Sequence, residues 1–376
     1  MLDRALVAKQ LQQSSDALFY DSTNERNLAF KTLKSIASNK LYPAILDTAN
    51  FVWPLVRWHA GLDDVFTVEP CDKAYRVLAV DGSQIYPDRH RGYECFLINI
   101  GVVELSYKVA CRRVWLVSFP RLFTPQSDLV DQRMDEERVN CHRTEHELLA
   151  GIEHALVMRE QTPDALMVFF VDGSLIFWHL DSKEPEVKQR FLTSYLILLE
   201  RFYQARIPLA GYISCPKSRD LIHLAGFELT RTGQSQLSIS LDRVVDAAAV
   251  QNLLQVGERT TIFASQSSIV DEYPDHLKPH FCYLNVGDEV VRIEFPAWVA
   301  QDQEQLDFIL SVCIDQAQKG QGYPVSLAEA HEQAVVKGHD REVFFRMLDT
   351  MARRHLGGQA SNVFSRKLLR KRRIGV

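Results

Sequence analysis

The sequence predicts an α/β protein with a mixed β-sheet core, flanking helices, and helical extensions at both ends of the chain. Three β-rich runs follow one another without a helix between them, which is typical of an antiparallel meander. The later run ALMVFFVD (165–172) is almost entirely apolar, like a strand covered on both faces. Helical periodicity separates and follows these strands. Together the three observations favour a sheet with both parallel and antiparallel neighbours.

The first half of the chain supplies an N-terminal arm and the centre of this sheet. Residues 1–70 are expected to be helical and loop-rich, with an aromatic cluster at Phe51, Trp53 and Trp58 that needs a partner surface. The meander is expected in YRVLAVD (75–81), ECFLINIGVVELSY (94–107) and CRRVWLVSF (111–119). A helix over about 137–158 precedes the buried strand, and a helix over about 186–204 leads to the strand PLAGYIS (208–214).

In the second half of the chain the secondary-structure signals are weaker at first, and helical patterns then follow. Segment 228–275 is expected to be an insertion, with a helix over DRVVDAAAVQNLL (242–254). The strands HFCYLNV (280–286) and EVVRIEFP (289–296) are expected to form a hairpin. Helices follow over about 302–319, 327–337 and 340–355. We therefore expect three parts: a helical arm (1–70), a main domain (71–345), and a helical end with a basic tail (346–376).

Composition excludes several classes of protein. The 376 residues are 46% hydrophobic and 24% charged, which excludes a disordered chain and a small disulfide-stapled one. The seven cysteines are widely spaced and never form a CxxC pair, so reduced thiols are expected. No run approaches the roughly 18 apolar residues of a membrane helix, and the N-terminus lacks the apolar segment of a secretory signal. These patterns predict a cytoplasmic protein without a membrane partner.

Charge is distributed unevenly along the chain. The formal net charge is −5, yet residues 351–376 contain eight basic residues and no acidic one. The rest of the chain has 35 basic against 48 acidic residues and therefore carries −13. A basic end of this kind indicates an anionic partner, although a solvated tail has the same composition.

The tripeptide Asp-Gly-Ser occurs twice, in AVDGSQI with Asp81 and in FVDGSLI with Asp172. Each copy stands where an apolar strand ends, and such aspartates point into the crevice where α/β sheets bind ligands. Strand-ending turns use the same residues. Two carboxylates on neighbouring strands can hold a hard divalent cation. Two such ions would clamp the attacking and leaving oxygens of a phosphodiester displacement.

A site of this kind needs a third acid, and the helix between the two strands offers Glu145, Glu147 and Glu153. Glu147 flanks the apolar stripe that is expected to face the sheet, so it is the first choice and Glu153 the second. Glu147 and Glu153 lie roughly 120° apart on the helix, so they cannot play the same part. A solvated helix face remains an alternative for each of them.

The segment GYPVSLAEAHEQAVV adds a histidine. Ser326 and Glu329 have the spacing of a capping box, which predicts a structural part for Glu329. His331 lies in the second turn of the expected helix. Beside a metal site it could ligate the ion, orient water or protonate a leaving group.

The ordered set of motifs resembles the NurA nuclease family. The set comprises VDGSQIYP (80–87), the helix glutamate, VDGSLI (171–176), YISCPKS (212–218), YLNVGDEVVRIEFP (283–296) and GYPVSLAEAHEQAV (322–335). The likeness runs from about residue 75 to about 340. It implies a ribonuclease-H-like core and a Mn²⁺-dependent DNA nuclease, exonuclease and single-strand endonuclease, with Mg²⁺ as an alternative metal. It also implies a homodimer that works with a hexameric HerA-type ATPase in end resection at double-strand breaks.

The resemblance also implies which residues form the site. Asp81 and Asp172 match the two motif aspartates, and His331 matches the family's C-terminal histidine. Arg143, four residues before Glu147, matches an Arg-xxx-Glu pattern. Asp81, Glu147, Asp172 and His331 are therefore the expected catalytic and metal-binding residues. Two other functions stay open: an adaptor that threads DNA for the ATPase with weak nuclease activity, and a nuclease for RNA or branched junctions.

Overall fold

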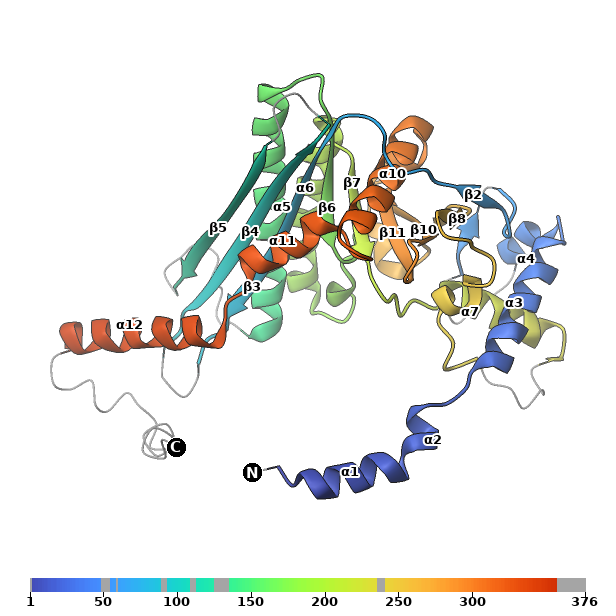
Figure 1. Ribbon diagram of the computed structural model, residues 1–376, viewed down its shortest axis with the longest axis horizontal. Helices are drawn as coiled ribbons and strands as arrows, with labels where there is room; N and C mark the ends of the chain where they lie inside the picture. Colours follow the sequence, from blue (N-terminus) through green and yellow to red (C-terminus); the bar gives the residue numbers. More distant parts are fainter. Residues whose placement is uncertain are drawn as a thin grey trace. The chain divides into compact units, whose positions relative to one another are not determined.

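The structure is a computed structural model that describes residues 2–48, 55–58, 60–88, 93–108, 113–124, 135–234 and 241–356 (Figure 1). Phe51, Trp53, Cys111 and the basic segment 366–376 lie outside the described residues. The strands form a mixed sheet of 11 strands with flanking helices, which confirms the predicted fold class. Among the described residues, no helix is both long and apolar enough to cross a membrane.

The chain divides into two compact units. Unit 1 comprises Met1–Thr67, Ser214–Ser267 and Phe281–Arg292. Unit 2 comprises Val68–Ile213, Ser268–His280 and Ile293–Val376. All the expected site residues belong to unit 2.

Unit 2 is built on the predicted meander. Its strands are β3 (Tyr75–Ile85), β4 (Phe96–Tyr107), β5 (Val114–Phe123), β6 (Leu166–Asp172) and β7 (Leu209–Ile213). The pairs β3–β4 and β4–β5 are antiparallel, whereas β6 is parallel to both β3 and β7. The resulting order β7-β6-β3-β4-β5 is the ribonuclease-H-like arrangement. The unbroken apolar run of β6 is explained by its central place between two parallel neighbours.

Helices cover both faces of this part of the sheet (Figure 1). On one face, α5 (Glu136–Gln161) packs on β3 and β4, and α6 (Pro185–Gln204) packs on α5. Asp135 caps the start of α5 by accepting from the Arg138 N–H at 2.8 Å. On the other face, α11 (Val325–Ala334) lies against β3 and β4. Unit 2 also contains η1 (Trp178–Leu180), η3 (Ser268–Glu272), η4 (Asp275–Leu277), α9 (Ala297–Ala300), α10 (Gln303–Lys319) and α12 (Gly338–Leu356).

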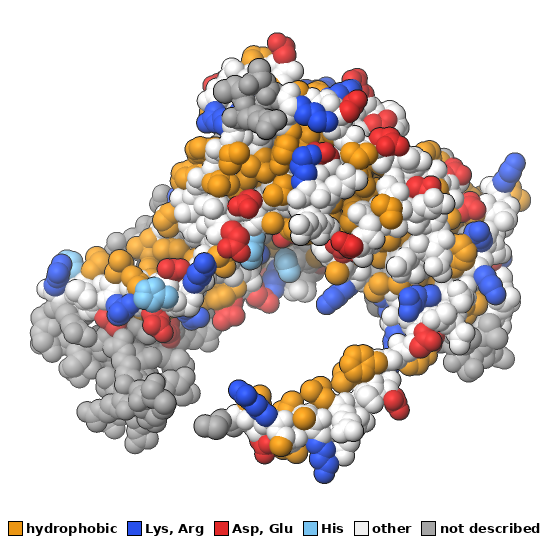
Figure 2. Space-filling view, in the orientation of Figure 1, with side chains coloured by type: hydrophobic (Ala, Val, Ile, Leu, Met, Phe, Trp, Pro, Cys, Tyr) orange, Lys and Arg blue, Asp and Glu red, His pale blue; other side chains and the backbone are white. Residues whose placement is uncertain are grey.

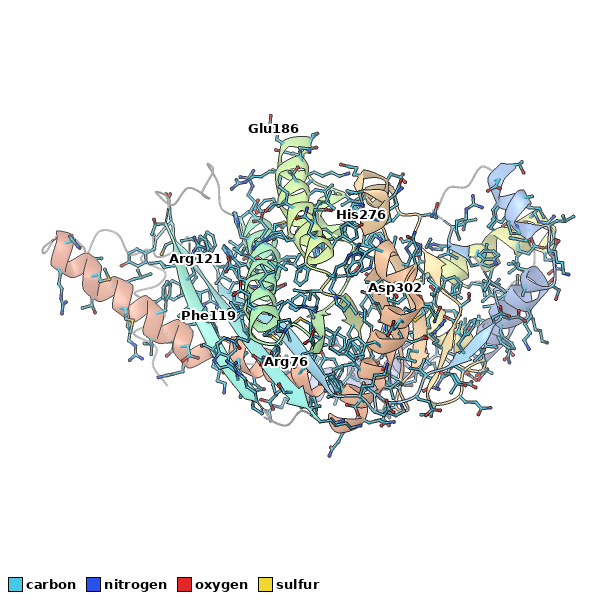
Figure 3. The ribbon with its side chains drawn as sticks, turned by 90° about the horizontal axis from the view of Figure 1, so that it is seen from above. Arg76, Phe119, Arg121, Glu186, His276 and Asp302 are labelled. Atoms are coloured by element: carbon cyan, nitrogen blue, oxygen red, sulfur yellow. The ribbon has the colours of Figure 1, made fainter. Side chains whose placement is uncertain are left out.

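Strand β5 is the edge of this sheet and is largely exposed. Apolar side chains gather over β4 and β5 in the space-filling view (Figure 2), and the exposed ones on β5 include Val114, Leu116 and Leu122. One buried ion pair links the inner strands: Arg76 on β3, labelled in Figure 3, binds Glu104 on β4. Because both side chains are almost fully buried, Arg76 without Glu104 would be an uncompensated buried charge, whereas Glu104 also has Arg113 Nε at 3.7 Å.

Unit 1 packs helices from two distant stretches around one core. Helix α3 (Thr23–Ala37) packs on α7 (Asp220–Arg231) and α8 (Asp246–Val250), with Ala29, Leu33 and Leu224 among the buried residues. Trp58 stacks on Tyr42 at 6.4 Å between ring centroids. The remaining elements are α1 (Arg4–Gln13), α2 (Ser15–Leu18), α4 (Tyr42–Thr48), β1 (Arg57–Trp58), β2 (Val65–Thr67), β8 (Glu258–Thr260) and β9 (Phe263–Ala264). Strands β10 (Pro279–Asn285) and β11 (Val290–Pro296) contribute residues to both units.

The predicted capping box at the start of α11 is wrong. The residue before the helix is Pro324, and no side chain caps that end. Ser326 is the second residue of the helix and is buried there, where its N–H donates to Gln316 Oε1 of α10 at 3.2 Å. The helix starts directly after Pro324, earlier than the Ser-xx-Glu spacing indicates.

Candidate active site

Asp81 and Asp172 lie side by side on neighbouring strands. The parallel register pairs Val80 with Val171, and each aspartate is the next residue along its strand. Paired residues of parallel strands point to the same face, and the strands are about 4.8 Å apart. Strand β6 ends at Asp172, whereas β3 continues to Ile85. The two Asp-Gly-Ser motifs therefore bring two carboxylates together at the point where one strand stops.

His331 joins Asp81 from the helix above the sheet. Its Nδ1 atom is 2.9 Å from Asp81 Oδ2. In the sheet Asp81 pairs with Gly101 of β4, and α11 lies directly on that glycine. A Cβ atom at residue 101 would come within 2.5 Å of both the Ala330 carbonyl oxygen and the Ala334 nitrogen. The missing side chain at Gly101 is therefore what lets the helix come close enough for His331 to reach Asp81.

The C-terminal end of α11 is anchored to the same two strands. The Asn99 amide donates to the Ala334 carbonyl at 2.8 Å, and the Ser83 hydroxyl donates to the same oxygen. These side chains satisfy a carbonyl that the end of a helix leaves without an intrahelical partner. The serine of the first Asp-Gly-Ser motif therefore holds the helix that carries His331.

Glu147 reaches the site from α5, on the opposite face. Its side chain is 14% exposed, and its Oε1 lies 3.2 Å from Arg143 Nε. The Gly82 N–H donates to Asp81 Oδ1 at 2.8 Å. A Cβ atom at residue 82 would lie 2.5 Å from Glu147 Oε1. The glycine of the first motif thus leaves the space that the Glu147 carboxylate occupies.

Burial raises the pKa of Glu147 to about 8. The negative charges of Asp81 and Asp172 contribute to this rise in the pKa, while Arg143 and the Gly82 N–H partly offset it. Because Glu147 Oε1 lies against Gly82, the residue next to Asp81, the Glu147 carboxyl group is close to the strand that carries Asp81. Glu153 is exposed, and Glu145 instead contacts His142 Nδ1 at 3.1 Å. Of the three helix glutamates, the structure brings Glu147 to the aspartates.

Tyr323 is a neighbour of Asp172 that sequence reasoning missed. Desolvation raises the pKa of Asp172, and the Asp81 charge adds to this, whereas a hydrogen bond from Tyr323 and the charge of His331 lower it. Tyr323 follows Gly322, whose φ of 108° belongs to the region that favours glycine. The segment 322–331 therefore contacts both aspartates, one through Tyr323 and the other through His331. The only sequence signal for Tyr323 was its place in the GYPV run.

The donor set fits a hard divalent cation. Three carboxyl groups and one imidazole suit Mg²⁺ and Mn²⁺. Arg143 faces the carboxyl group of Glu147, and a metal ion would offset the remaining negative charge of the three carboxyl groups. Among the described residues, no three His, Cys, Asp or Glu side chains stand as ligands around one point. The oxygens of Asp81 bind Gly82 and His331 instead, so metal ligation requires side-chain rotation.

Fold and site together define a class: an α/β protein with a carboxylate-rich site on a ribonuclease-H-like sheet. The family model described as the NurA domain matches residues 75–336, more than half of the chain. The chain therefore belongs to the NurA family of nucleases, and the predicted resemblance is confirmed.

Solved structures give further likenesses. A crystal structure of NurA with manganese has a TM-score of 0.44 and 11% sequence identity, covering 90% of this chain and 98% of that chain. A crystal structure of NurA has a TM-score of 0.41 and 10% identity, covering 92% and 97%. A crystal structure of NurA bound to dAMP and manganese has a TM-score of 0.36 and 11% identity, covering 90% and 94%. No curated protein matches the chain.

Proposed function

We propose that this protein is a metal-dependent deoxyribonuclease that hydrolyses phosphodiester bonds at Asp81, Glu147, Asp172 and His331. The observation that carries the proposal is the register of β3 and β6, which sets Asp81 beside Asp172 within reach of the buried Glu147. Mn²⁺ is the proposed metal, with Mg²⁺ as the alternative, because both accept carboxylate oxygens. When bound, the metal supplies Lewis-acid polarisation of the phosphate and a water of lowered pKa.

The surroundings of each side chain suggest its role in the proposed reaction. Asp81, Asp172 and Glu147 would hold the metal, since their carboxyl groups share one region. Tyr323 orients Asp172 through its hydrogen bond. The Nδ1–H of His331 donates to Asp81, and no described residue binds Nε2. Since the His331 side chain is 59% exposed, Nε2 can ligate the metal or deliver a proton to the leaving 3′ oxygen.

Family membership supports a more specific biological proposal. The protein acts in end resection at DNA double-strand breaks as a cytoplasmic homodimer, together with a hexameric HerA-type ATPase. It degrades DNA as an exonuclease and cuts single strands as an endonuclease. The basic residues between 366 and 376 support an affinity for DNA.

The test compares an aspartate of the site with an aspartate outside it. Purified protein is incubated with linear duplex DNA, single-stranded DNA, RNA and a branched junction, with Mn²⁺, Mg²⁺ or EDTA. Asp172→Asn should lose at least 100-fold in cleavage rate while its melting temperature stays near wild type. Asp164→Asn, an exposed residue eight positions earlier in the chain, is the matched control. Full activity of Asp172→Asn would overturn the assignment, and faster cleavage of RNA or junctions would overturn DNA as the substrate.

The partnership with an ATPase needs a separate measurement. The cleavage rate and the elution volume of the protein are compared with and without a HerA-type ATPase. The proposal expects a faster rate and a larger complex. If neither quantity changes, the ATPase is not a partner of this chain.

A further inference from the structure

An exposed tryptophan follows the second site aspartate by six residues. In VDGSLIFWHL the side chains of Leu175, Ile176 and Phe177 are buried, and the chain then turns outward at Trp178 in η1. Trp178 is 43% exposed, although tryptophan is usually largely buried in folded proteins. Its neighbour Leu180 returns to the core. The buried residues on both sides thus hold one large aromatic ring at the surface.

The orientation of the Trp178 indole is fixed by the hydroxyl group of Ser174, whose hydrogen-bonding capacity is fully used. Ser174 Oγ donates to Glu294 Oε2 at 2.7 Å, and it accepts from the Ile176 N–H at 3.0 Å and from Trp178 Nε1–H at 3.1 Å. These bonds use the one proton and both lone pairs of the hydroxyl. The indole therefore has its polar atom bound. Among the described residues, no aromatic ring stacks on it.

The backbone of the same loop is equally constrained. The Leu175 N–H donates to Glu294 Oε2 at 2.8 Å, and the Phe177 N–H donates to the Tyr273 hydroxyl at 3.1 Å. Both acceptors are buried. A ring on this loop loses little conformational freedom when a flat ligand stacks on it, which favours binding.

Through its bond to Ser174, the Trp178 indole is tied to the part of the chain next to Asp172. Ser174 is two residues from Asp172, so their Cα atoms are at most about 7 Å apart. The side chain of Asp172 is exposed, so a phosphate can reach it. Since Trp178 Nε1 is bonded to Ser174, a strand whose phosphate lies at Asp172 would have a neighbouring base within reach of the indole. Every base has a π-face that stacks on an aromatic side chain, and an unpaired base is free to do so, whereas a paired base already lies in the duplex stack.

We propose that Trp178 is a stacking platform for an unpaired base of the DNA strand held at Asp172, and that it gives the site a preference for single-stranded ends. This inference rests on the proposed nuclease function. It assigns substrate selection to a residue outside the set of metal-binding and catalytic side chains.

The test measures DNA binding in EDTA, so that it does not depend on cleavage. Fluorescence anisotropy with a labelled single-stranded oligonucleotide should show an affinity about 5- to 150-fold weaker for Trp178→Ala, the range for losing one base–aromatic stack. Trp178→Phe keeps an aromatic face and should stay within about 5-fold of wild type. Affinity for blunt duplex DNA should change by less than about 2-fold. The matched control is Phe119→Ala, since Phe119 is 42% exposed and lies on β5 (Figure 3).

A series of oligonucleotides with one abasic position locates the stacked base. In wild type, one abasic position should weaken binding, and in Trp178→Ala the same position should have no effect. Unchanged binding by Trp178→Ala, or an abasic pattern identical in both proteins, would overturn the proposal. Equal loss on single-stranded and duplex DNA would overturn it too. A variant that binds DNA normally but no longer assembles with a second copy or an ATPase would make Trp178 a protein-docking residue instead. Wild-type protein that binds but never cleaves would refute the nuclease function and leave the stacking intact.

Discussion

Replacing Gly82 with alanine should disable the proposed metal site while leaving the fold intact. The new Cβ atom would lie 2.5 Å from Glu147 Oε1 and 2.7 Å from Arg143 Cγ. Ordinary contact begins at 3.4 Å, so the Glu147 carboxylate must retreat by about 0.9 Å. Metal–ligand distances tolerate only about 0.2 Å. We therefore expect Mn²⁺ affinity and cleavage rate to fall about 10- to 100-fold or more.

The stability of the same variant should barely change. The atoms that must move belong to side chains and not to the backbone, and alanine restricts the unfolded chain more than glycine does. We expect the free energy of unfolding to stay within about 1 kcal/mol of wild type. Isothermal titration with Mn²⁺, a single-strand cleavage assay and thermal unfolding measure the three quantities.

A control variant and a compensating double variant test the reason given for this prediction. Gly226→Ala in α7 is the control, because a Cβ atom there meets nothing within 4 Å, and alanine favours a helix. In the double variant Gly82→Ala/Glu147→Asp, the shorter acid makes room for the methyl group, so part of the Mn²⁺ affinity should return. If Gly82→Ala binds Mn²⁺ and cleaves DNA like wild type, Glu147 is not a ligand and the assignment of the third acid fails.

Four other predictions follow from the same contacts. Gly101→Ala should lift α11 and lower the cleavage rate about 10-fold or more. In a His331→Ala background it should cause no further loss of rate, although it should still lower the free energy of unfolding by the cost of overpacking, about 1–3 kcal/mol in denaturant unfolding. In metal-free protein the folded state keeps a proton on Glu147 between about pH 4.5 and 8, where the unfolded state has lost it. The free energy of unfolding should therefore fall with rising pH across that window by up to about 1.4 kcal/mol per pH unit. Glu147→Gln should remove this slope in urea titrations, and an unchanged slope in that variant would contradict the prediction. Glu104→Ala should lower the free energy of unfolding by about 3–5 kcal/mol because it leaves a buried arginine unpaired; a loss below 1 kcal/mol in denaturant unfolding would mean that water reaches the pair. Deleting residues 366–376 should weaken DNA affinity and flatten its salt dependence without changing Mn²⁺ binding; an equal salt slope would show that this segment does not bind phosphate.

Local patterns predicted most of the elements around the site. The helix expected at 137–158 is α5, and the apolar run at 165–172 is β6. Apolar periodicity is a property of neighbouring residues, so it can be read without knowing the fold. The weakest prediction was the helix over 242–254, where the structure has only α8, at Asp246–Val250. The segment 242–254 lacks a clear apolar face, so its helical pattern was weak.

The sequence by itself also predicted which chemical groups the proposed site contains: two aspartates that end apolar strands, a helix glutamate and a histidine. It could not decide between Glu147 and Glu153, because a helical wheel gives the angle between two residues and not the place where the neighbouring strand stops. The contributions of Gly101 and Tyr323 were equally invisible, since each acts on a residue far away in the chain. Strand register and helix docking set those contacts, and both depend on the packing of the whole sheet. Tertiary structure therefore decided how the groups meet: Gly82 leaves room for Glu147, and Gly101 lets His331 reach Asp81.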